Sequence, residues 1–157
     1  MKDMESLPLL KAAQQGDLQA FNQLALAHQE PAFHFACAYL GDDRLADQAL
    51  GEAFRRVYHD LPRANGLAIE SKFKVLLYRH VAVCCQAAAS GGAAPARPAG
   101  NLFVGRLHEL PCDQRLALLL VELAGLSYRD IAQVIGKPPA AVRSFIAQAR
   151  RSLLVAH

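Results

Sequence analysis

The chain has 157 residues, of which 53% are hydrophobic and 20% charged, a balance that excludes an intrinsically disordered protein and fits one domain or two small ones. Its formal net charge of +3 is common among soluble proteins and by itself indicates no class of partner. Alanine and leucine dominate, aromatic residues make up only 7%, and runs of β-branched residues are scarce. This composition predicts an all-α fold.

The sequence offers no segment that should enter a membrane. No apolar run reaches the roughly 18 to 20 residues of a membrane span. Acidic Asp3 and Glu5, without a long apolar core behind them, argue against a secretory signal. The four cysteines have no secretory context, which favours reduced thiols. We therefore expect a cytoplasmic protein that contacts no membrane.

Four segments of helical periodicity precede residue 90. They run from Leu7 to His28, from Pro31 to Leu40, from Leu45 to Leu61 and from Ser71 to about Ala89. Pro62 ends the third segment, whose apolar side chains recur most regularly: Ala46, Leu50, Ala53, Phe54, Val57 and Leu61. In the fourth segment the predicted buried stripe consists of Phe73, Leu76, Leu77, Val81 and Cys84.

A stretch rich in Ala, Gly and Pro follows these segments and is the only low-complexity part of the chain. Its glycines and prolines cannot sustain a helix. We therefore predict two small helical domains, residues 1–89 and 102–157, joined by a flexible linker over residues 90–101.

The last two helical segments have the pattern of a helix-turn-helix. Tyr128 to Ile135 and Ala140 to Leu154 are separated only by Gly136-Lys-Pro-Pro139. Ser127 is suited to cap the first of these helices, and Gly136 is suited to the left-handed residue that ends it. In the second helix one face is apolar, with Val142, Ile146, Ala149 and Leu153.

Three arginines, Arg143, Arg150 and Arg151, are left on the other side of this last helix. No acidic residue follows Asp130, so the end of the chain is positively charged throughout. The pattern predicts a helix that lies in a DNA major groove. A helical hairpin with a solvated basic face is the alternative.

The sequence gives little support for a catalytic site or a metal site. His34 and Cys37, and likewise His80 and Cys84, share a helix face, so four zinc-type ligands could converge if those helices pack together. Two buried thiols beside two partly exposed imidazoles are the favoured interpretation. No phosphate loop, nucleophile triad or carboxylate pair is present, and we expect neither an enzyme nor a bound cofactor or metal.

Several motifs, in order along nearly the whole chain, resemble the small bacterial extracytoplasmic-function sigma factors. In the first domain these are Ala13–Phe21, Leu40–Asp42 with Ala46-Asp47 and Glu52–Phe54, and Phe73–Arg79. In the second they are Leu110-Pro111 with Arg115, Gly125–Ala132, Val142–Ser144 and Ala149-Arg150. The resemblance implies three partners: RNA polymerase core, promoter DNA and an anti-sigma factor.

The resemblance also assigns roles to residues. It places polymerase contact at Asp47, Gln48 and Glu52, and weak contact with single-stranded DNA at Tyr78 and Arg79. Promoter contact falls on the last helix and the turn before it, at Lys137, Arg143, Ser144, Gln148, Arg150 and Arg151.

The chain departs from the family where the family makes contacts. Gln48 and Gly51 stand where the third helix usually carries an Asp and a Gln, and Ala140-Ala141 and Phe145 replace polar or basic positions of the last helix. Phe145 either completes its own domain core or packs on a protein partner. Residues 84–89 replace the basic run at the strand-opening end of the fourth helix.

Two functions are therefore compatible with the sequence. One is a sigma-factor-like regulator of transcription initiation that binds polymerase core and promoter DNA. The alternative is a degenerate sigma-like interaction protein that binds an anti-sigma factor or another regulator without promoter melting. Because stacking aromatics and a positive groove hold single strands, we expect the first domain alone to bind single-stranded promoter DNA weakly.

Overall fold

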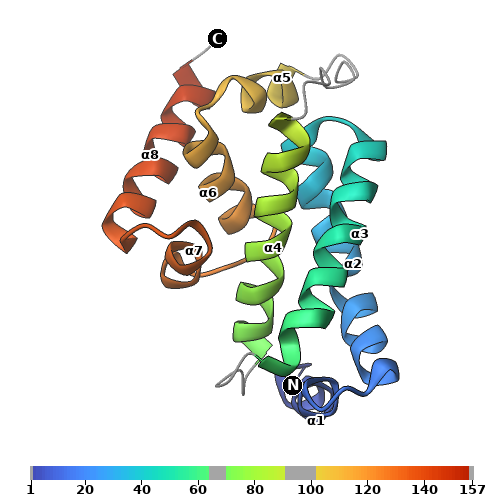
Figure 1. Ribbon diagram of the computed structural model, residues 1–157. Coiled ribbons are helices and arrows are strands. Elements are labelled where there is room, and N and C mark those ends of the chain that lie inside the picture. Colours follow the sequence, from blue (N-terminus) through green and yellow to red (C-terminus); the bar gives the residue numbers. More distant parts are fainter. Residues whose placement is uncertain (1, 64–69, 91–101, 156–157) are drawn as a thin grey trace.

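The computed structural model describes residues 2–63, 70–90 and 102–155, and all regular structure in these residues is helical. The first domain comprises α1 (Lys2–Gln14), α2 (Leu18–Leu40), α3 (Asp43–Asp60), the short 3-10 turn η1 (Leu61–Arg63) and α4 (Glu70–Ser90). The second comprises α5 (Leu102–Glu109), α6 (Cys112–Glu122), α7 (Tyr128–Ile135) and α8 (Pro139–Val155). Figure 1 shows α4 in the middle, with α2 and α3 on one side and α6, α7 and α8 on the other. The predicted all-α fold with two helical domains is confirmed.

The first two helices divide the chain at a different point from the predicted one. The break lies at Gly16, whose φ of 97° only glycine adopts easily. Asp17 then caps α2, because its Oδ1 accepts a hydrogen bond from the backbone N–H of Ala20 at 3.1 Å. The predicted division into one helix from Leu7 to His28 and another from Pro31 to Leu40 is therefore wrong, because the two helices divide at Gly16 instead.

Pro31 lies inside α2 and does not end it. Its ring is exposed, so the lost hydrogen bond and the bulk of the ring fall on the solvent side. The buried stripe of α2 continues across this position, from Leu24 and His28 to Ala32, Phe35 and Tyr39. Burial of this continuous face outweighs the local preference of proline.

Helix α3 follows the predicted pattern closely. Asp42 caps it, with Oδ1 accepting from the backbone N–H groups of Arg44 and Leu45 at 2.9 and 3.2 Å. The predicted stripe is buried except at Phe54, which is only half-buried and lies at the edge of the core. Phe54 therefore keeps one face available to a partner.

The structure confirms the helix-turn-helix, including the two residues predicted to begin and end its first helix. Ser127 Oγ accepts a hydrogen bond from the backbone N–H of Asp130 at 3.1 Å and begins α7. Gly136 ends it with a φ of 79°. In α8, Val142, Ile146 and Ala149 are buried, as predicted.

The two domains lie against each other. Helix α7 packs on α4, and α5 and α6 contact α2. Of the predicted linker, residues 91–101 lie outside the described residues. None of the helices that the structure describes combines the length and apolar character needed to span a membrane.

Candidate functional site

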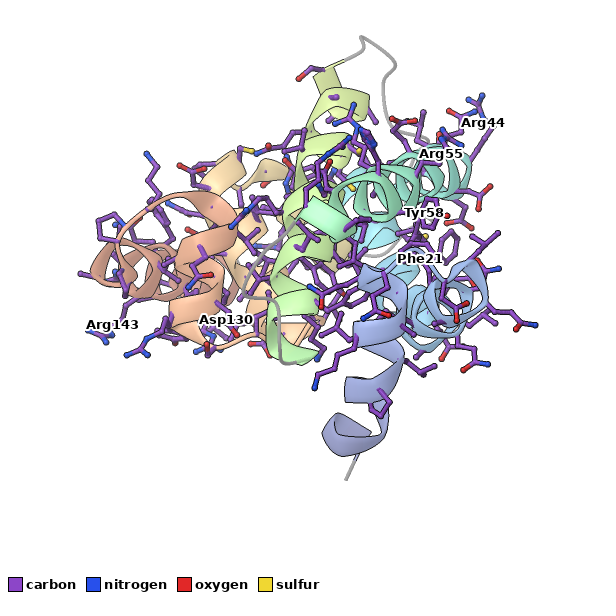
Figure 2. The ribbon with its side chains drawn as sticks, turned by 60° about the horizontal axis from the view of Figure 1, so that its bottom comes forward. Phe21, Arg44, Arg55, Tyr58, Asp130 and Arg143 are labelled. Atoms are coloured by element: carbon purple, nitrogen blue, oxygen red, sulfur yellow. The ribbon has the colours of Figure 1, made fainter. Side chains whose placement is uncertain are left out.

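The outer face of α8 carries the open basic surface of the second domain. Arg143, Ser144 and Arg151 are exposed, as is Lys137 in the turn before the helix. In Figure 2 the side chain of Arg143 points away from the molecule at its outer edge. Among the described residues Arg143 has no ion-pair partner, so its guanidinium is available to an external anion.

Two other residues assigned to DNA contact form hydrogen bonds or ion pairs with side chains of the second domain itself. Gln148 Oε1 accepts a hydrogen bond from Gln114 Nε2 of α6 at 2.9 Å, and Gln148 Nε2 donates to Ser144 Oγ at 3.3 Å. Arg150 Nη2 lies 2.8 Å from Glu122 Oε2, and this hydrogen bond raises the pKa of Arg150. The structure thus brings four of the six predicted residues to an open face and holds Gln148 and Arg150 partly against α6.

Phe145 is half-buried and packs against the core of its own domain. Of the two alternatives left by the sequence, packing within the protein agrees with this position.

The residues assigned to polymerase contact lie on α3. Asp47 and Gln48 are exposed. Glu52 is held by two arginines of the next turn, Arg55 at 2.6 Å and Arg56 at 3.1 Å. These hydrogen bonds, that of Arg55 first, lower the pKa of the Glu52 carboxyl. The charge of Glu52 is therefore compensated by two arginines, whereas Asp47 has no ion-pair partner among the residues that the structure describes.

A groove between α2 and α3 adjoins Asp47 and was not foreseen from the sequence. Its volume is about 520 Å³, and its lining combines apolar side chains with a few polar ones: Phe21, Asn22, Ala25, Leu26, Gln29, Asp47, Leu50, Gly51 and Phe54. Leu26 is 70% exposed beside it. A Cβ built on Gly51 would meet no atom within 4 Å, so this glycine leaves the groove open.

Two aromatic rings border the same side of the first domain. Phe21 and Tyr58 meet edge to face, with ring centroids 5.0 Å apart. Figure 2 shows both residues on the opposite side of the molecule from Arg143. The α2–α3 groove and the α8 face therefore look in opposite directions.

Tyr78, assigned to single-stranded DNA, is a core residue in this structure. It is 1% exposed and packs edge-on against Phe35, with centroids 5.4 Å apart. Burial raises the pKa of its hydroxyl to about 12. The base-stacking role given to Tyr78 needs correction, because its ring faces protein and not solvent; Arg79 beside it is exposed.

The zinc-type alternative also lacks its geometry. His80 Nε2 lies 2.9 Å from Asp60 Oδ2 instead of beside a thiol. Within the described ranges no group of three or more potential ligands comes together.

A second groove, almost wholly apolar, lies on the second domain. It has a volume of about 620 Å³ and its lining comes mainly from α5, α6 and α8: Ala38, Leu107, Leu118, Leu119, Glu122, Leu123, Arg150, Leu153 and Leu154. Leu154 is 69% exposed at its edge, and the Glu122–Arg150 ion pair forms part of its rim. Leucines recurring on α6 and α8 were the sequence signal for it, but they could not be told from core residues.

Comparison with known proteins gives consistent matches. The family model described as "Sigma-70, region 4" matches residues 102–153. The ECF RNA polymerase sigma factor SigC of Mycobacterium tuberculosis is 32% identical over 167 aligned positions, covering 93% of this chain and 88% of that protein. The ECF RNA polymerase sigma-E factor of Haemophilus influenzae is 30% identical, covering 92% and 91% respectively.

Two solved structures share the fold. CnrH in complex with the cytosolic domain of CnrY aligns with a TM-score of 0.78 at 22% identity, covering 96% of this chain and 95% of that one. The sigma factor RpoE in complex with the anti-sigma factor NepR, from Bartonella quintana, aligns with a TM-score of 0.67 at 19% identity, covering 87% and 95%. At these identities the likeness concerns the arrangement of the helices alone.

Proposed function

The chain belongs to the ECF RNA polymerase sigma factors, and on this basis we propose that it directs transcription initiation by binding RNA polymerase core and promoter DNA. The open basic face of α8, set on a capped helix-turn-helix, is the observation that carries the proposal. It acts by binding, not by catalysis, and it acts in the cytoplasm, where polymerase meets DNA.

Promoter recognition is assigned to the second domain. A recognition helix contacts base edges with its first turns and the phosphate backbone with residues farther along. Arg143 lies in the second turn of α8 and is exposed, which suits it to a base edge. Lys137 and Arg151 flank the helix start and its far end and suit phosphate contact.

Polymerase contact is assigned to the α2–α3 groove with Asp47 on its wall. An apolar floor bordered by a charged residue fits a partner helix that inserts an apolar side chain and pairs a basic one with Asp47. Gln48, exposed on the same helix, adds a polar contact at the rim. Glu52 contributes less, because Arg55 and Arg56 already occupy its oxygens.

An anti-sigma factor is the proposed regulatory partner. The two solved structures of similar fold are both complexes, one with the cytosolic domain of CnrY and one with the anti-sigma factor NepR. In this chain the apolar groove of α5, α6 and α8 offers a site for the apolar face of a helix.

Binding to polymerase can be tested by size-exclusion chromatography of the purified chain with core enzyme. Wild-type protein should elute with the core, and Asp47→Arg should elute largely apart from it. Glu109→Arg makes the same charge change at an exposed position of α5 and serves as the matched control. Equal co-elution of both variants would remove the α2–α3 groove from the interface, and failure of the wild type to co-elute would overturn the proposed function.

The sigma-like interaction protein remains a second candidate for one reason. The ring of Tyr78 is buried and no basic run follows on α4, so the surface that would hold a melted strand is poor. This candidate predicts binding to a regulator, with no promoter-dependent transcripts.

A further inference from the structure

Two side-chain hydrogen bonds in series join α6 to the open face of α8. Gln114 Nε2, on α6, donates to Gln148 Oε1 on α8 at 2.9 Å. Gln148 Nε2 in turn donates to Ser144 Oγ, one turn earlier on α8, at 3.3 Å. Helix α6 packs alongside α8 (Figure 1), so Gln114 belongs to a supporting helix. This relay of Gln114, Gln148 and Ser144 therefore runs from the inside of the second domain to the surface assigned to promoter DNA.

The relay fixes the direction in which the Ser144 hydroxyl can form a hydrogen bond. Because Gln114 occupies Gln148 Oε1, the amide group that Gln148 turns toward Ser144 is its NH2. The hydroxyl oxygen accepts that hydrogen bond, and Ser144 has no other hydrogen-bond partner among the residues that the structure describes. Ser144 is exposed, so its own proton is left for an external group. A hydroxyl in this state binds an acceptor.

Half of the Gln114 amide is unsatisfied. Its Oε1 is buried and has no hydrogen-bond partner within the described part of the chain. A buried polar atom without a partner destabilises a protein, so a side chain that keeps one needs an explanation other than stability. The opposite orientation of the amide would bury an NH2 group with two unpaired protons. Unpaired N–H groups are rarer in proteins than unpaired carbonyl oxygens, which favours the observed direction of the relay.

Duplex DNA offers acceptors for such a donor. Phosphate oxygens and several base atoms in the major groove accept hydrogen bonds, and serine binds both kinds. Ser144 lies in the second turn of α8, next to Arg143, so it reaches the same stretch of a duplex. A free serine side chain samples three staggered rotamers. Holding one of them before binding can therefore improve affinity by up to about threefold.

We propose that Gln114 is a positioning residue for promoter binding: acting through Gln148, it holds the Ser144 hydroxyl as a hydrogen-bond donor toward an acceptor of duplex DNA. The proposal rests on the proposed sigma-factor function. Gln148 contributes to recognition through Ser144, since its carbonyl oxygen and its amide nitrogen are both engaged within the protein. Arg143 supplies a positive charge, and Ser144 supplies a directed neutral donor beside it.

The relay itself can be tested in the full chain without DNA. In heteronuclear NMR spectra the side-chain amide signal of Gln148 should shift in Gln114→Met and also in Ser144→Ala, because each change removes one of its hydrogen bonds. Gln114→Met also removes the buried unpaired oxygen, so the melting midpoint should not fall. Gln19→Met, the same change at an exposed position of α2, should leave the Gln148 signal in place. A Gln148 signal that moves in neither relay variant would overturn the inference, whatever DNA binding shows.

A double-mutant cycle on duplex binding tests the positioning role. Fluorescence anisotropy compares a duplex that carries the promoter of the chain's own gene with a scrambled duplex. Ser144→Ala should lower the affinity for the promoter duplex about threefold to tenfold, the usual effect of one hydrogen bond. Gln114→Met should lower it about threefold when Ser144 is present and not at all in the Ser144→Ala background. An equal effect in both backgrounds would assign Gln114 to the packing of α6 on α8 and overturn the positioning role.

Two sets of duplexes identify the acceptor. In one set each phosphate in turn is replaced by an uncharged methylphosphonate, and in the other each base pair in turn is exchanged. At one position the change should weaken binding of the wild type several-fold more than binding of Ser144→Ala, and its set tells a phosphate from a base edge. Absence of such a position from both sets would overturn the donor role of Ser144. If the relay is present in the spectra but the wild type does not prefer the promoter duplex, the proposed function fails, and the positioning role fails with it.

Discussion

Arg143 is the side chain on which DNA specificity should depend most. It is exposed on α8, without an ion-pair partner in the described part of the chain. If its guanidinium makes a bidentate contact with a base, Arg143→Ala should reduce discrimination between related promoter sequences by about 1 to 3 kcal/mol. Arg151→Ala should instead weaken binding to all duplexes alike and flatten the salt dependence. Fluorescence anisotropy with matched and mismatched duplexes at several salt concentrations measures both effects.

Arg150 provides the internal control for this assignment. Its ion pair with Glu122 holds it toward α6. Arg150→Ala should therefore change duplex affinity less than either of the other two substitutions. A loss of sequence discrimination on Arg150→Ala as large as that on Arg143→Ala would contradict the geometry of the α8 face.

His28 should make stability depend on pH. It is buried, its Nδ1 donates to the carbonyl oxygen of Leu24 at 2.9 Å, and its ring lies 5.0 Å from that of Phe73. Burial, first, and the nearby Lys74 lower its pKa below the ordinary value. The unfolded chain then binds a proton more readily than the folded one. The stability that neutral His28 contributes is present above the unfolded value of about 6.5 and is lost as pH falls toward the folded value.

Thermal melting between about pH 7.5 and about pH 5 should therefore show a falling midpoint. His28→Leu should reduce this fall, and His34→Leu, at an exposed position of the same helix, should leave it in place. Part of the fall should survive His28→Leu, because burial and Arg115 lower the pKa of His108 as well. A pH profile unchanged by His28→Leu would show that the imidazole titrates alike in both states.

At the scale of elements, the helix-turn-helix was predictable almost to the residue because its signals are local. Ser127 and Gly136 delimit α7 by capping chemistry that no distant contact overrides. The break between α1 and α2 was not predictable in the same way. Pro31 gives the stronger local signal, yet burial of Ala32 and Phe35 beyond it keeps α2 continuous.

The partners of the different faces of α4 could not be predicted from the sequence. Its predicted stripe is buried, but Val75, Tyr78, Ala82 and Cys85 are buried too. A run that is apolar all round does not say which faces meet the first domain and which meet another part of the chain. The burial of Tyr78, and with it the loss of the stacking role, depends on that tertiary information.

The groove between α2 and α3 yields a prediction about Gly51. Glycine in a helix interior costs about 1 kcal/mol relative to alanine, and a Cβ at Gly51 would meet no atom within 4 Å. Gly51→Ala should therefore raise the free energy of unfolding by about that amount in urea titrations. Gly51→Leu should fill the groove and weaken binding to polymerase core without loss of stability.

Ala27→Leu adds apolar bulk at an exposed position of α2 outside the groove and should leave polymerase binding intact. Undiminished binding by Gly51→Leu would show that the partner does not enter the groove. A lower stability of Gly51→Ala would show that the glycine is required by the fold itself.

At the scale of the whole molecule, the two proposed binding surfaces face apart, with α4 between them (Figures 1 and 2). This placement lets polymerase and duplex DNA bind the same chain at once. The departures from the family on α4 should therefore affect the opening of promoter DNA more than the binding of polymerase.

Transcription from a purified system tests the central claim most directly. Core polymerase, the purified chain and a template carrying the promoter of the chain's own gene should give run-off transcripts from one start point. Core polymerase alone should give none from that point, and Arg143→Ala should reduce them strongly. A chain that binds the core yet adds no transcripts on this template, or on a panel of other promoters from its genome, would contradict a sigma factor and establish the interaction protein in its place.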